Sequence, residues 1–422
     1  MQNGPRRFQQ QFGNLLDELM PDDNAPISGR FRPRPRRIPR SGRERRVMRK
    51  RTLGLLLLLV LAFASRTFAD EVVDGQLGPG ALYRLVRPTN WNGSLLLYAH
   101  GYVPAASPVV LPPEADIFVA LLAPRGYALA FSSFSENGWA VKDGVQRTHQ
   151  LLGIFAGRFG APSRIYMGGA SMGGLIAIKL LEDHPDLFAG SLAACAASGG
   201  SRQQYDYMGN TRALFDIFYP DILPGNAGSV PAGLDLSTSI AVPAAAAILS
   251  NPAGAATIAS ITQTPIPWSQ PGELLESMTT ALVGNAAAAN DLVPKLPGSL
   301  YFDNADVTYS SPLLPPAVLA GINATVDRFS GSQSALNYLD HYYQPTGDLR
   351  VPMVMLSNSL DPVVPGFHRL AYRNLVTAAG NGDRLVQRTI SRYGHCTFTP
   401  AEIATAVLDL VAWVEFGVKP LP

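Results

Sequence analysis

The sequence predicts an α/β fold in which a mostly parallel, doubly wound sheet is interrupted by a large helical cap. Apolar runs of strand length alternate with helical segments both before residue 199 and after residue 346, which favours parallel strands joined by crossover helices. The strand runs are almost unbroken in apolar character, as in strands buried on both faces of a sheet. One of them runs into a Gly-x-Ser-x-Gly turn at residues 169–173 and leaves as an apolar helix. Because the alternation resumes after the interruption, the outer segments are predicted to form one core.

The elements before the interruption follow this alternation closely. The run Ser94 to His100 is apolar almost throughout, and Tyr127 to Phe131 repeats the pattern after a helical stretch. Strands are predicted at 81–86, 94–100, 127–131, 164–170 and 188–195, and helices at 117–125, 141–158 and 172–184. Residues 70–198 are therefore predicted to form the first part of the core.

Regular alternation stops at residues 199–346, which we predict to form the cap. The segment is rich in Ala, Pro, Gly, Asn and Ser, but a structureless stretch of this length is improbable inside a compact domain. Aromatic residues such as Phe215 and Trp268 also argue against a disordered linker. Helical pieces are predicted at 242–249, 272–283 and 334–342. Residues 347–422 then complete the core, with strands at 351–356 and 384–390 and helices at 367–378 and 400–414.

The first 69 residues are predicted to lie outside the core. A basic cluster at 49–51 precedes an apolar run from Leu53 to Ala64, and small residues suited to cleavage follow at Ala64 and Ala69. A run this short with such flanks favours a cleaved signal peptide at 48–69 over the alternative, an uncleaved anchor. Residues 1–47 are rich in Arg and Pro and are predicted to be a disordered basic extension. Met48 offers a second translation start. If translation begins there, the start at Met1 is mis-assigned and residues 1–47 are not part of the protein.

The positive charge of the chain is concentrated in the same region. Residues 1–69 hold 15 of the 34 Lys and Arg but 5 of the 32 Asp and Glu, so the rest has a net charge near −8. An acidic folded part argues against a nucleic-acid partner. The composition, 47% hydrophobic and 16% charged, is sufficient for a sizeable core.

Ser171 is the predicted nucleophile. A sharp turn between a strand and a helix holds such a serine hydroxyl clear of the backbone. Side chains at the flanking positions would collide with the neighbouring strand or helix, and Gly169 and Gly173 avoid this. The alternative is an ordinary glycine-rich turn.

A serine hydroxyl needs a base within hydrogen-bond reach, and the base needs an acceptor that fixes its tautomer. Asp361 follows the predicted strand 351–356, and His395 follows the strand 384–390. Since the carboxyl ends of parallel strands lie at one edge of a sheet, Ser171, Asp361 and His395 are expected to meet there. Other carboxylates and histidines fit less directly; they are Asp303, Asp340, Asp348, Asp383, His149, His184, His341 and His368.

Two backbone N–H groups are predicted to form an oxyanion hole. One belongs to Met172, directly after the nucleophile, and the other comes from the turn after the strand 94–100, most directly from Tyr102. His100 is predicted to shape this turn rather than to act as a second catalytic histidine.

These motifs together resemble the α/β-hydrolase superfamily, in its serine esterase and lipase-like form. The motifs are Gly169 to Gly174, His100-Gly101, Asp361-Pro362-Val363-Val364-Pro365 and Gly394-His395-Cys396. The resemblance covers about residues 80–200 and 350–420 and leaves the cap unaccounted for. It implies an α/β-hydrolase fold with an eight-stranded, mostly parallel sheet, the cap between strands 6 and 7, and a Ser-Asp-His triad.

Cys195 and Cys396 are the two cysteines of the chain, too few for a disulfide scaffold. In an exported protein they can form one bridge or stay reduced. His395-Cys396 is also similar to tannases and feruloyl esterases, in which a cysteine after the histidine bridges one before the serine. Here Ala170 precedes the serine, so the partner of Cys396 in any bridge must be Cys195.

The sequence therefore favours an exported serine hydrolase, secreted or periplasmic, that cleaves carboxylic esters through an acyl-enzyme on Ser171. A serine peptidase of the same fold and a non-catalytic secreted binding protein are the alternatives. Neither a metal nor a nucleotide cofactor is implied, because the spacings that hold them do not occur. The expected partner is a small or polymeric ester, with membrane contact only through an uncleaved signal segment. The Ala, Leu, Tyr and Phe content of the cap favours an apolar or aromatic acyl group.

Overall fold

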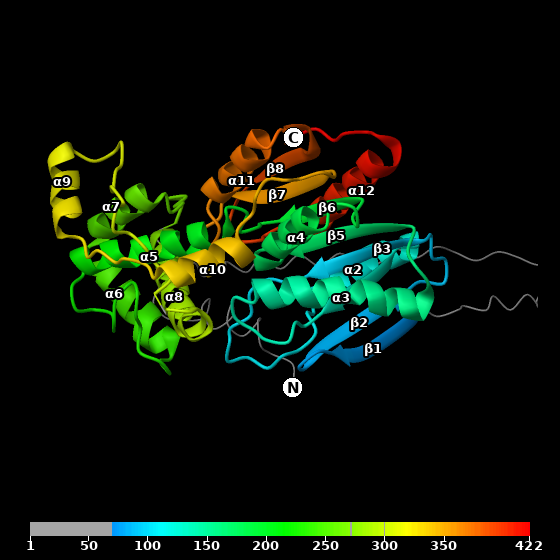
Figure 1. Ribbon diagram of the computed structural model, residues 1–422. Helices are drawn as coiled ribbons and strands as arrows, with labels where there is room; N and C mark the ends of the chain where they lie inside the picture. Colours follow the sequence, from blue (N-terminus) through cyan, green and yellow to red (C-terminus); the bar gives the residue numbers. More distant parts are fainter. Residues whose placement is uncertain (1–69, 271, 299) are drawn as a thin grey trace, which may run out of the picture. The chain divides into compact units, whose positions relative to one another are not determined.

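The fold is built on one eight-stranded sheet. The computed structural model describes residues 70–270, 272–298 and 300–422, so the predicted extension (1–47) and signal peptide (48–69) lie outside the described residues. The strand order is β1-β2-β4-β3-β5-β6-β7-β8 (Figure 1). The strands are β1 (Glu71–Leu77), β2 (Ala81–Arg87), β3 (Ser94–Ala99), β4 (Ala128–Ser132), β5 (Arg164–Ala170), β6 (Gly190–Ala194), β7 (Met353–Leu360) and β8 (Leu385–Tyr393).

The sheet is mostly parallel, as predicted. β2 runs antiparallel to both of its neighbours, β1 and β4. Every pairing from β4 to β8 is parallel. The core helices that connect these strands are α2 (Ala115–Leu122), α3 (Val141–Phe159), α4 (Met172–Asp183) and α11 (Phe367–Ala378), and α12 (Pro400–Phe416) follows β8. The carboxyl ends of β3, β5, β6, β7 and β8 therefore share one edge of the sheet.

Hydrophobic side chains cover both faces of the sheet, which explains the unbroken apolar strands. In β3, Leu95, Leu97 and Ala99 belong to a cluster that includes residues of α3, α4 and α11. Leu96 and Tyr98 point to the opposite face and join a cluster with α2 and α12. Alternate residues of a strand face opposite sides of the sheet, so a central strand between two helical layers must be apolar at every position.

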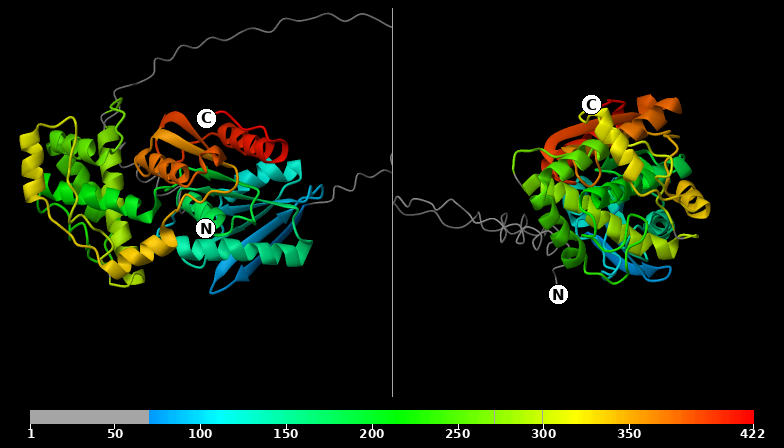
Figure 2. Two further views of the ribbon diagram at one scale, coloured as in Figure 1. Left: turned by 45° about the horizontal axis from the view of Figure 1, so that its top comes forward. Right: turned by 90° about the vertical axis from the view of Figure 1, so that its left-hand side faces the viewer.

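The segment between β6 and β7 is largely helical, and we call residues 199–346 the insertion. Its helices are α5 (Gly200–Phe218), α6 (Val242–Ser250), α7 (Pro252–Thr262), α8 (Gly272–Lys295), α9 (Pro316–Thr325) and α10 (Gln333–Tyr343), with a π-helical turn at Ser237–Ala241. Figures 1 and 2 show α6, α7, α8 and α9 gathered beyond the sheet edge at which β3 and β5 end. The insertion therefore lies beside the edge at which the predicted site residues follow their strands.

A buried carboxylate ties the insertion to the core. Asp291 of α8 accepts a hydrogen bond from the backbone N–H of Trp139 at 2.5 Å and pairs with Lys295 at 2.7 Å. Gly138 permits this approach, because a Cβ there would lie 2.2 Å from a carboxylate oxygen of Asp291. The indole of Trp139 donates to Ser201 of α5 at 2.6 Å. One loop before α3 thus holds two helices of the insertion.

The described residues contain no single helix with the length and apolar character needed to span a membrane. One sharply bent pair, Ser237–Ser250 with Pro252–Thr262 at 110°, meets the criteria of length and composition when its two parts are taken together.

Candidate active site

The turn from β5 into α4 presents Ser171. The residue adopts φ 58° and ψ −121°, a conformation that non-glycine residues rarely take. Its backbone N–H donates to Ala194 O at 2.9 Å, which ties the turn to the end of β6. A Cβ at Gly169 would lie 2.0 Å from Gly173 O, and a Cβ at Gly173 would lie 2.1 Å from Ala99 O. Both glycines are therefore required sterically, as the sequence predicts.

Asp361 lies just beyond the end of β7 and is almost fully buried, with 1% of its surface exposed. Its Oδ1 accepts hydrogen bonds from the backbone N–H groups of Val363 and Val364, each at 2.9 Å. These bonds hold the carboxylate in one orientation and leave Oδ2 free to face another partner. A buried polar group is costly unless it is hydrogen-bonded, and the two backbone donors meet this need.

His395 joins the other two residues. Its Nδ1 lies 2.7 Å from Asp361 Oδ2, and its Nε2 lies 2.8 Å from Ser171 Oγ. Because a carboxylate can only accept, Nδ1 carries the proton and Nε2 is left to accept from the serine hydroxyl. The structure thus brings the three predicted residues into one hydrogen-bonded chain, an arrangement that can activate a hydroxyl for nucleophilic attack.

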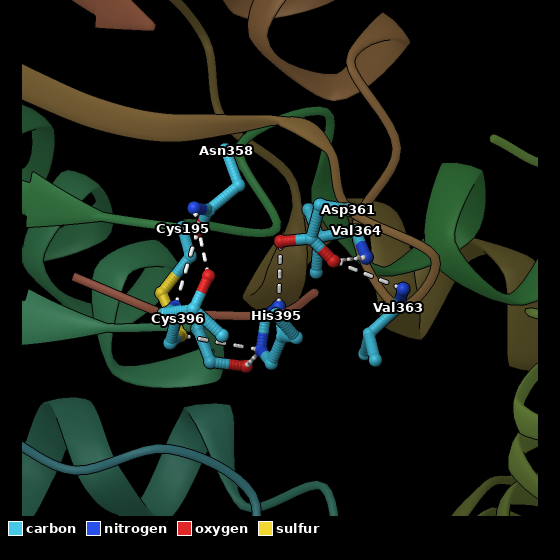
Figure 3. Close-up of a disulfide and its surroundings, with 9 residues drawn as sticks. Cys195, Asn358, Asp361, Val363, Val364, His395 and Cys396 are labelled. Carbon is cyan, nitrogen blue, oxygen red and sulfur yellow. Dashed lines mark hydrogen bonds and ion pairs between the residues drawn. A yellow bond between two sulfur atoms is a disulfide. The ribbon is translucent and has the colours of Figure 1, made fainter. Parts of the chain in front are cut away.

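A disulfide lies directly beside the histidine. Cys195 and Cys396 are bonded to each other across 201 residues, with their Cα atoms 5.4 Å apart. Figure 3 shows His395 between this bridge and Asp361, and Cys396 Sγ lies 3.4 Å from His395 Nε2. Cys195 follows β6 and donates its N–H to Leu356 O of β7. The bridge therefore fastens the histidine loop to the centre of the sheet.

The same group of atoms could be mistaken for a metal site. The two sulfurs and a His395 nitrogen lie within 4.8 Å of one another, the one group of three such ligand atoms found among the described residues. Metals bind thiolates, whereas these sulfurs are joined in a disulfide. The group therefore offers a metal one imidazole nitrogen, which Ser171 already engages.

A second clamp on the histidine loop comes from β7. The Asn358 side chain donates to Thr397 Oγ1 at 2.9 Å and accepts from the Thr397 backbone N–H at 3.3 Å. Asn358 is buried and lies three residues before Asp361. Sequence reasoning missed this residue, because an asparagine within an apolar strand gives no sign of its partner.

The residues predicted for the oxyanion hole lie at the serine. Met172 is the first residue of α4, so its N–H has no acceptor within the helix. The turn that carries Tyr102 adjoins the nucleophile, because a Cβ at Gly101 would lie 3.3 Å from Ser171 Cβ. The Tyr102 side chain is 37% exposed, and the partial desolvation of its phenol, with the nearby Asp291 carboxylate, raises its pKa. This phenol is therefore neutral at physiological pH.

The alternative histidines have other surroundings. His100 is buried, stacks on Phe134 with ring centroids 3.9 Å apart, and places Nδ1 2.7 Å from Gly101 O. Burial lowers the pKa of His368 to about 3, and its Nδ1 accepts from the N–H of Gly199. His149 and His184 stack on each other, and His341 is exposed near the end of α10.

The alternative carboxylates also have other partners. Asp340 pairs with Arg202, Asp348 with Arg350, and Asp383 with Lys419. Asp303 accepts from the backbone N–H groups of Ala305 and Gly331. Each of these four carboxylates is thus engaged away from the histidine that contacts Ser171.

No family model and no curated protein matches the sequence. Solved structures similar to this chain include a proline iminopeptidase of Mycobacterium smegmatis (12% identity, 83% of this chain and 100% of that chain covered, TM-score 0.43). Two others are an esterase of Pyrococcus furiosus (11%, 81% and 90%, TM-score 0.42) and an esterase of Aspergillus oryzae (16%, 83% and 80%, TM-score 0.43).

Similarities at these identities and TM-scores carry no information on activity. The fold is therefore identified from the structure of this chain itself. Three features define it: the strand order, the single reversed strand β2, and the sharp serine turn between β5 and α4. The loops that carry Asp361 and His395 follow β7 and β8, so the three residues occur in the chain order Ser, Asp, His that the α/β-hydrolase fold has. The chain therefore has the α/β-hydrolase fold.

Proposed function

We propose that this protein is an exported serine hydrolase that cleaves carboxylic esters through an acyl-enzyme on Ser171. The observation that carries the proposal is the chain of hydrogen bonds from Ser171 Oγ through the imidazole of His395 to Asp361, at 2.8 and 2.7 Å. His395 accepts the serine proton while the oxygen attacks the ester carbonyl. Asp361 keeps the ring in the required tautomer and stabilises the imidazolium that forms.

The remaining steps use the same groups. The N–H groups of Met172 and Tyr102 stabilise the negative charge that develops on the carbonyl oxygen. The His395 imidazolium then gives its proton to the departing alkoxide, which leaves the acyl group on Ser171. A water that gives its proton to His395 attacks this acyl-enzyme, and the proton returns to Ser171 as the acid leaves.

The Ala, Leu, Tyr and Phe content of the insertion supports an apolar or aromatic acyl group as substrate. The rings of Trp139 and Tyr205 meet edge to face with centroids 5.2 Å apart, and Tyr205 meets Tyr301 in the same way at 5.5 Å. All three side chains are buried, with 5% or less of each exposed. The three rings belong to the same hydrophobic cluster as Met172, the residue after the nucleophile.

The disulfide supports the proposal that the protein is exported. Disulfides form and persist in oxidising compartments and are rare in the cytosol. The bridge between Cys195 and Cys396 therefore agrees with the signal peptide expected from the sequence. Secretion or transfer to the periplasm is the proposed location.

A substrate panel tests the activity. The purified protein and its Ser171→Ala variant are assayed with p-nitrophenyl esters of graded chain length and with aminoacyl and prolyl p-nitroanilides. We expect ester turnover that the variant lacks, with a chain-length optimum that sizes the acyl pocket. Turnover of anilides alone would replace the esterase by a peptidase. A folded protein that turns over neither class would favour the binding protein.

A further inference from the structure

Two side chains of α5 in the insertion bind the loop that carries Asp361. The Tyr207 hydroxyl donates to Pro362 O at 2.9 Å, and Gln204 Nε2 donates to Val363 O at 2.8 Å. Both side chains are buried, with 5% of Tyr207 and 2% of Gln204 exposed. These bonds join a helix of the insertion to the acid of the triad, although neither side chain bonds to Asp361 itself.

The two carbonyls belong to the same peptide groups that hold the carboxylate. The Pro362 carbonyl shares a peptide group with the Val363 N–H, and the Val363 carbonyl shares one with the Val364 N–H. Both N–H groups donate to Asp361 Oδ1 at 2.9 Å, as Figure 3 shows. Two parallel series of hydrogen bonds thus run from α5 to the same carboxylate oxygen, and each passes through one peptide group.

Hydrogen bonds in such chains strengthen one another. A donor on a peptide carbonyl polarises the group and makes its N–H a better donor, by roughly 10–30% per bond. The Asp361 Oδ1 oxygen is therefore bound more firmly than the two N–H groups alone would bind it. Negative charge held at Oδ1 is not available at Oδ2, the oxygen that faces His395 Nδ1. The two donors on α5 thereby set both the orientation and the strength of the Asp361–His395 bond.

We propose that Gln204 and Tyr207 are positioning residues of the triad, which act on Asp361 through the peptide groups 362–363 and 363–364. The inference rests on the proposed function, because it assigns a role within the same triad. It makes α5 a fixed part of the catalytic apparatus rather than part of a cover over it. This role fits the place of α5 in the chain, since the helix begins five residues after the disulfide-bonded Cys195.

The test removes one donor at a time. Tyr207→Phe deletes the hydroxyl alone, and Gln204→Met keeps the length of the side chain without its amide. Tyr219→Phe is the matched control, because that buried hydroxyl also donates to a backbone carbonyl, Asn251 O at 2.5 Å, without touching the Asp361 loop. Circular dichroism and the unfolding midpoint verify that each variant folds.

The main readout is the low-field proton resonance of the His395 Nδ1–H that bridges to Asp361. Weaker donors at Oδ1 leave more charge at Oδ2, so this bond shortens and its proton resonance moves downfield. We expect a downfield shift in Tyr207→Phe and in Gln204→Met, a larger one in the double variant, and none in Tyr219→Phe. An unchanged or upfield resonance in both folded single variants would overturn the inference, as would an equal shift in the control.

The rate of inactivation by a serine-directed phosphonate is the second readout. Because the Asp361 carboxylate is then held less firmly in the orientation that aligns His395 with Ser171, we expect each single variant to slow the reaction at saturating phosphonate by about 3- to 10-fold, less than the roughly 10²-fold loss that a 1 Å misplacement causes. The phosphonate concentration for half-saturation should not change. A wild-type protein that resists labelling would contradict the proposed function, while the resonance would still decide the role of Gln204 and Tyr207. Equal rates in the wild type and both variants would count against that role.

Discussion

Asp361 determines which nitrogen of His395 carries the proton. Its Oδ2 accepts from Nδ1 at 2.7 Å, and Oδ1 is occupied by two backbone donors. An asparagine here could present its NH2 group to Nδ1 and stabilise the tautomer with the proton on Nε2. That tautomer cannot accept the proton of Ser171.

Asp361→Asn is therefore expected to lower kcat on the preferred ester by on the order of 10⁴, the size of this effect in a serine protease with the same triad. The rate of product release at saturating ester gives kcat, and the unfolding midpoint is the control for folding. A loss of less than tenfold would move the acid role to another residue.

The surroundings of Asp206 predict a pH dependence of the folding stability. It lines a cavity of about 640 Å³ between α5, α10 and α11, which none of the triad residues borders. Burial raises the pKa of this carboxyl to about 7, although Arg202 opposes the shift. The native state therefore holds a proton that the unfolded chain releases near pH 4. The stability this gives is fully present below about pH 4 and is lost as the pH rises through 7.

Asp206→Asn is expected to remove this pH dependence. Because the cavity opens to solvent, we expect the variant to gain about 1–2 kcal/mol in free energy of unfolding at pH 8 and little at pH 4. Urea unfolding of both proteins at the two pH values gives the comparison. An equal difference at pH 4 and pH 8 would contradict the assignment of a raised pKa to Asp206.

The roles of some residues in the candidate site can be predicted from the sequence, and those of others cannot. Ser171, Asp361 and His395 can be predicted because each follows an apolar strand that marks its place at the sheet edge. Gln204 and Tyr207 could not be predicted, because their partners are backbone carbonyls more than 150 residues away. A hydrogen bond to a backbone carbonyl leaves no pattern in the sequence of either partner.

Among the elements, β5 offers a matched pair of glycines for a mutational test. A Cβ at Gly169 would lie 2.0 Å from the backbone oxygen of Gly173, whereas a Cβ at Gly168 would meet Leu96 Cδ1 at an ordinary 3.6 Å. We expect Gly169→Ala to cost about 3 kcal/mol or more of stability. Gly168→Ala should change it by less than about 1 kcal/mol, since the methyl fits and the unfolded chain loses freedom.

Urea unfolding and phosphonate labelling of the two variants provide the measurement. Gly168→Ala is expected to keep both the midpoint and the labelling of Ser171, and Gly169→Ala to lose them together. Similar behaviour of the two variants would show that the turn can open around a methyl group.

The predicted elements match the structure best where a helix buries one face or a strand buries both faces against its neighbours. The helix predicted at 367–378 has the bounds of α11, and the predicted helix 141–158 corresponds to α3. β1 was not predicted, because it is an edge strand whose side chains alternate between partly buried and exposed. Its polar alternation and internal glycine look like a loop in sequence.

The helices of the insertion were harder to predict. α5 buries residues around most of its circumference, so its sequence lacks the one-sided apolar period of a surface helix. α8 was predicted to end at residue 283 but continues to Lys295. Gly284 and Asn285 weaken the helical pattern there, yet packing against Met208 and a hydrogen bond from Asn285 to Ala227 O hold the chain helical.

On the scale of the whole molecule, the disulfide closes a loop of 201 residues that contains the entire insertion. A crosslink over so long a loop removes much of the freedom of the unfolded chain. The chain-entropy model gives about 5 kcal/mol for this length. The double variant Cys195→Ala with Cys396→Ala is expected to lose several kcal/mol of this stability.

Denaturant unfolding of the double variant and of the reduced wild type checks this value, because both lack the bridge and should agree. The double variant should also react more slowly with phosphonate, since the bridge fastens the loop that carries His395. An unchanged midpoint in both samples would show that the bridge does not limit the unfolded chain.

The arrangement of the sheet within the described residues was predictable in outline. Strand–helix alternation on both sides of residues 199–346 predicts a single interrupted core, and the sheet indeed draws strands from both sides. The contacts between insertion and core, such as Asp291 with the Trp139 N–H, could not be predicted, since a buried aspartate resembles a solvated one in sequence.

The central claim is that Ser171 is a nucleophile activated by His395, and covalent labelling tests it most directly. The purified protein is treated with a serine-directed fluorophosphonate, digested and analysed by mass spectrometry, with Ser171→Ala and His395→Ala treated in parallel. We expect one adduct, located on Ser171, which is absent from the first variant and formed far more slowly in the second. An adduct on another serine, or none on a folded wild-type protein, would contradict the account.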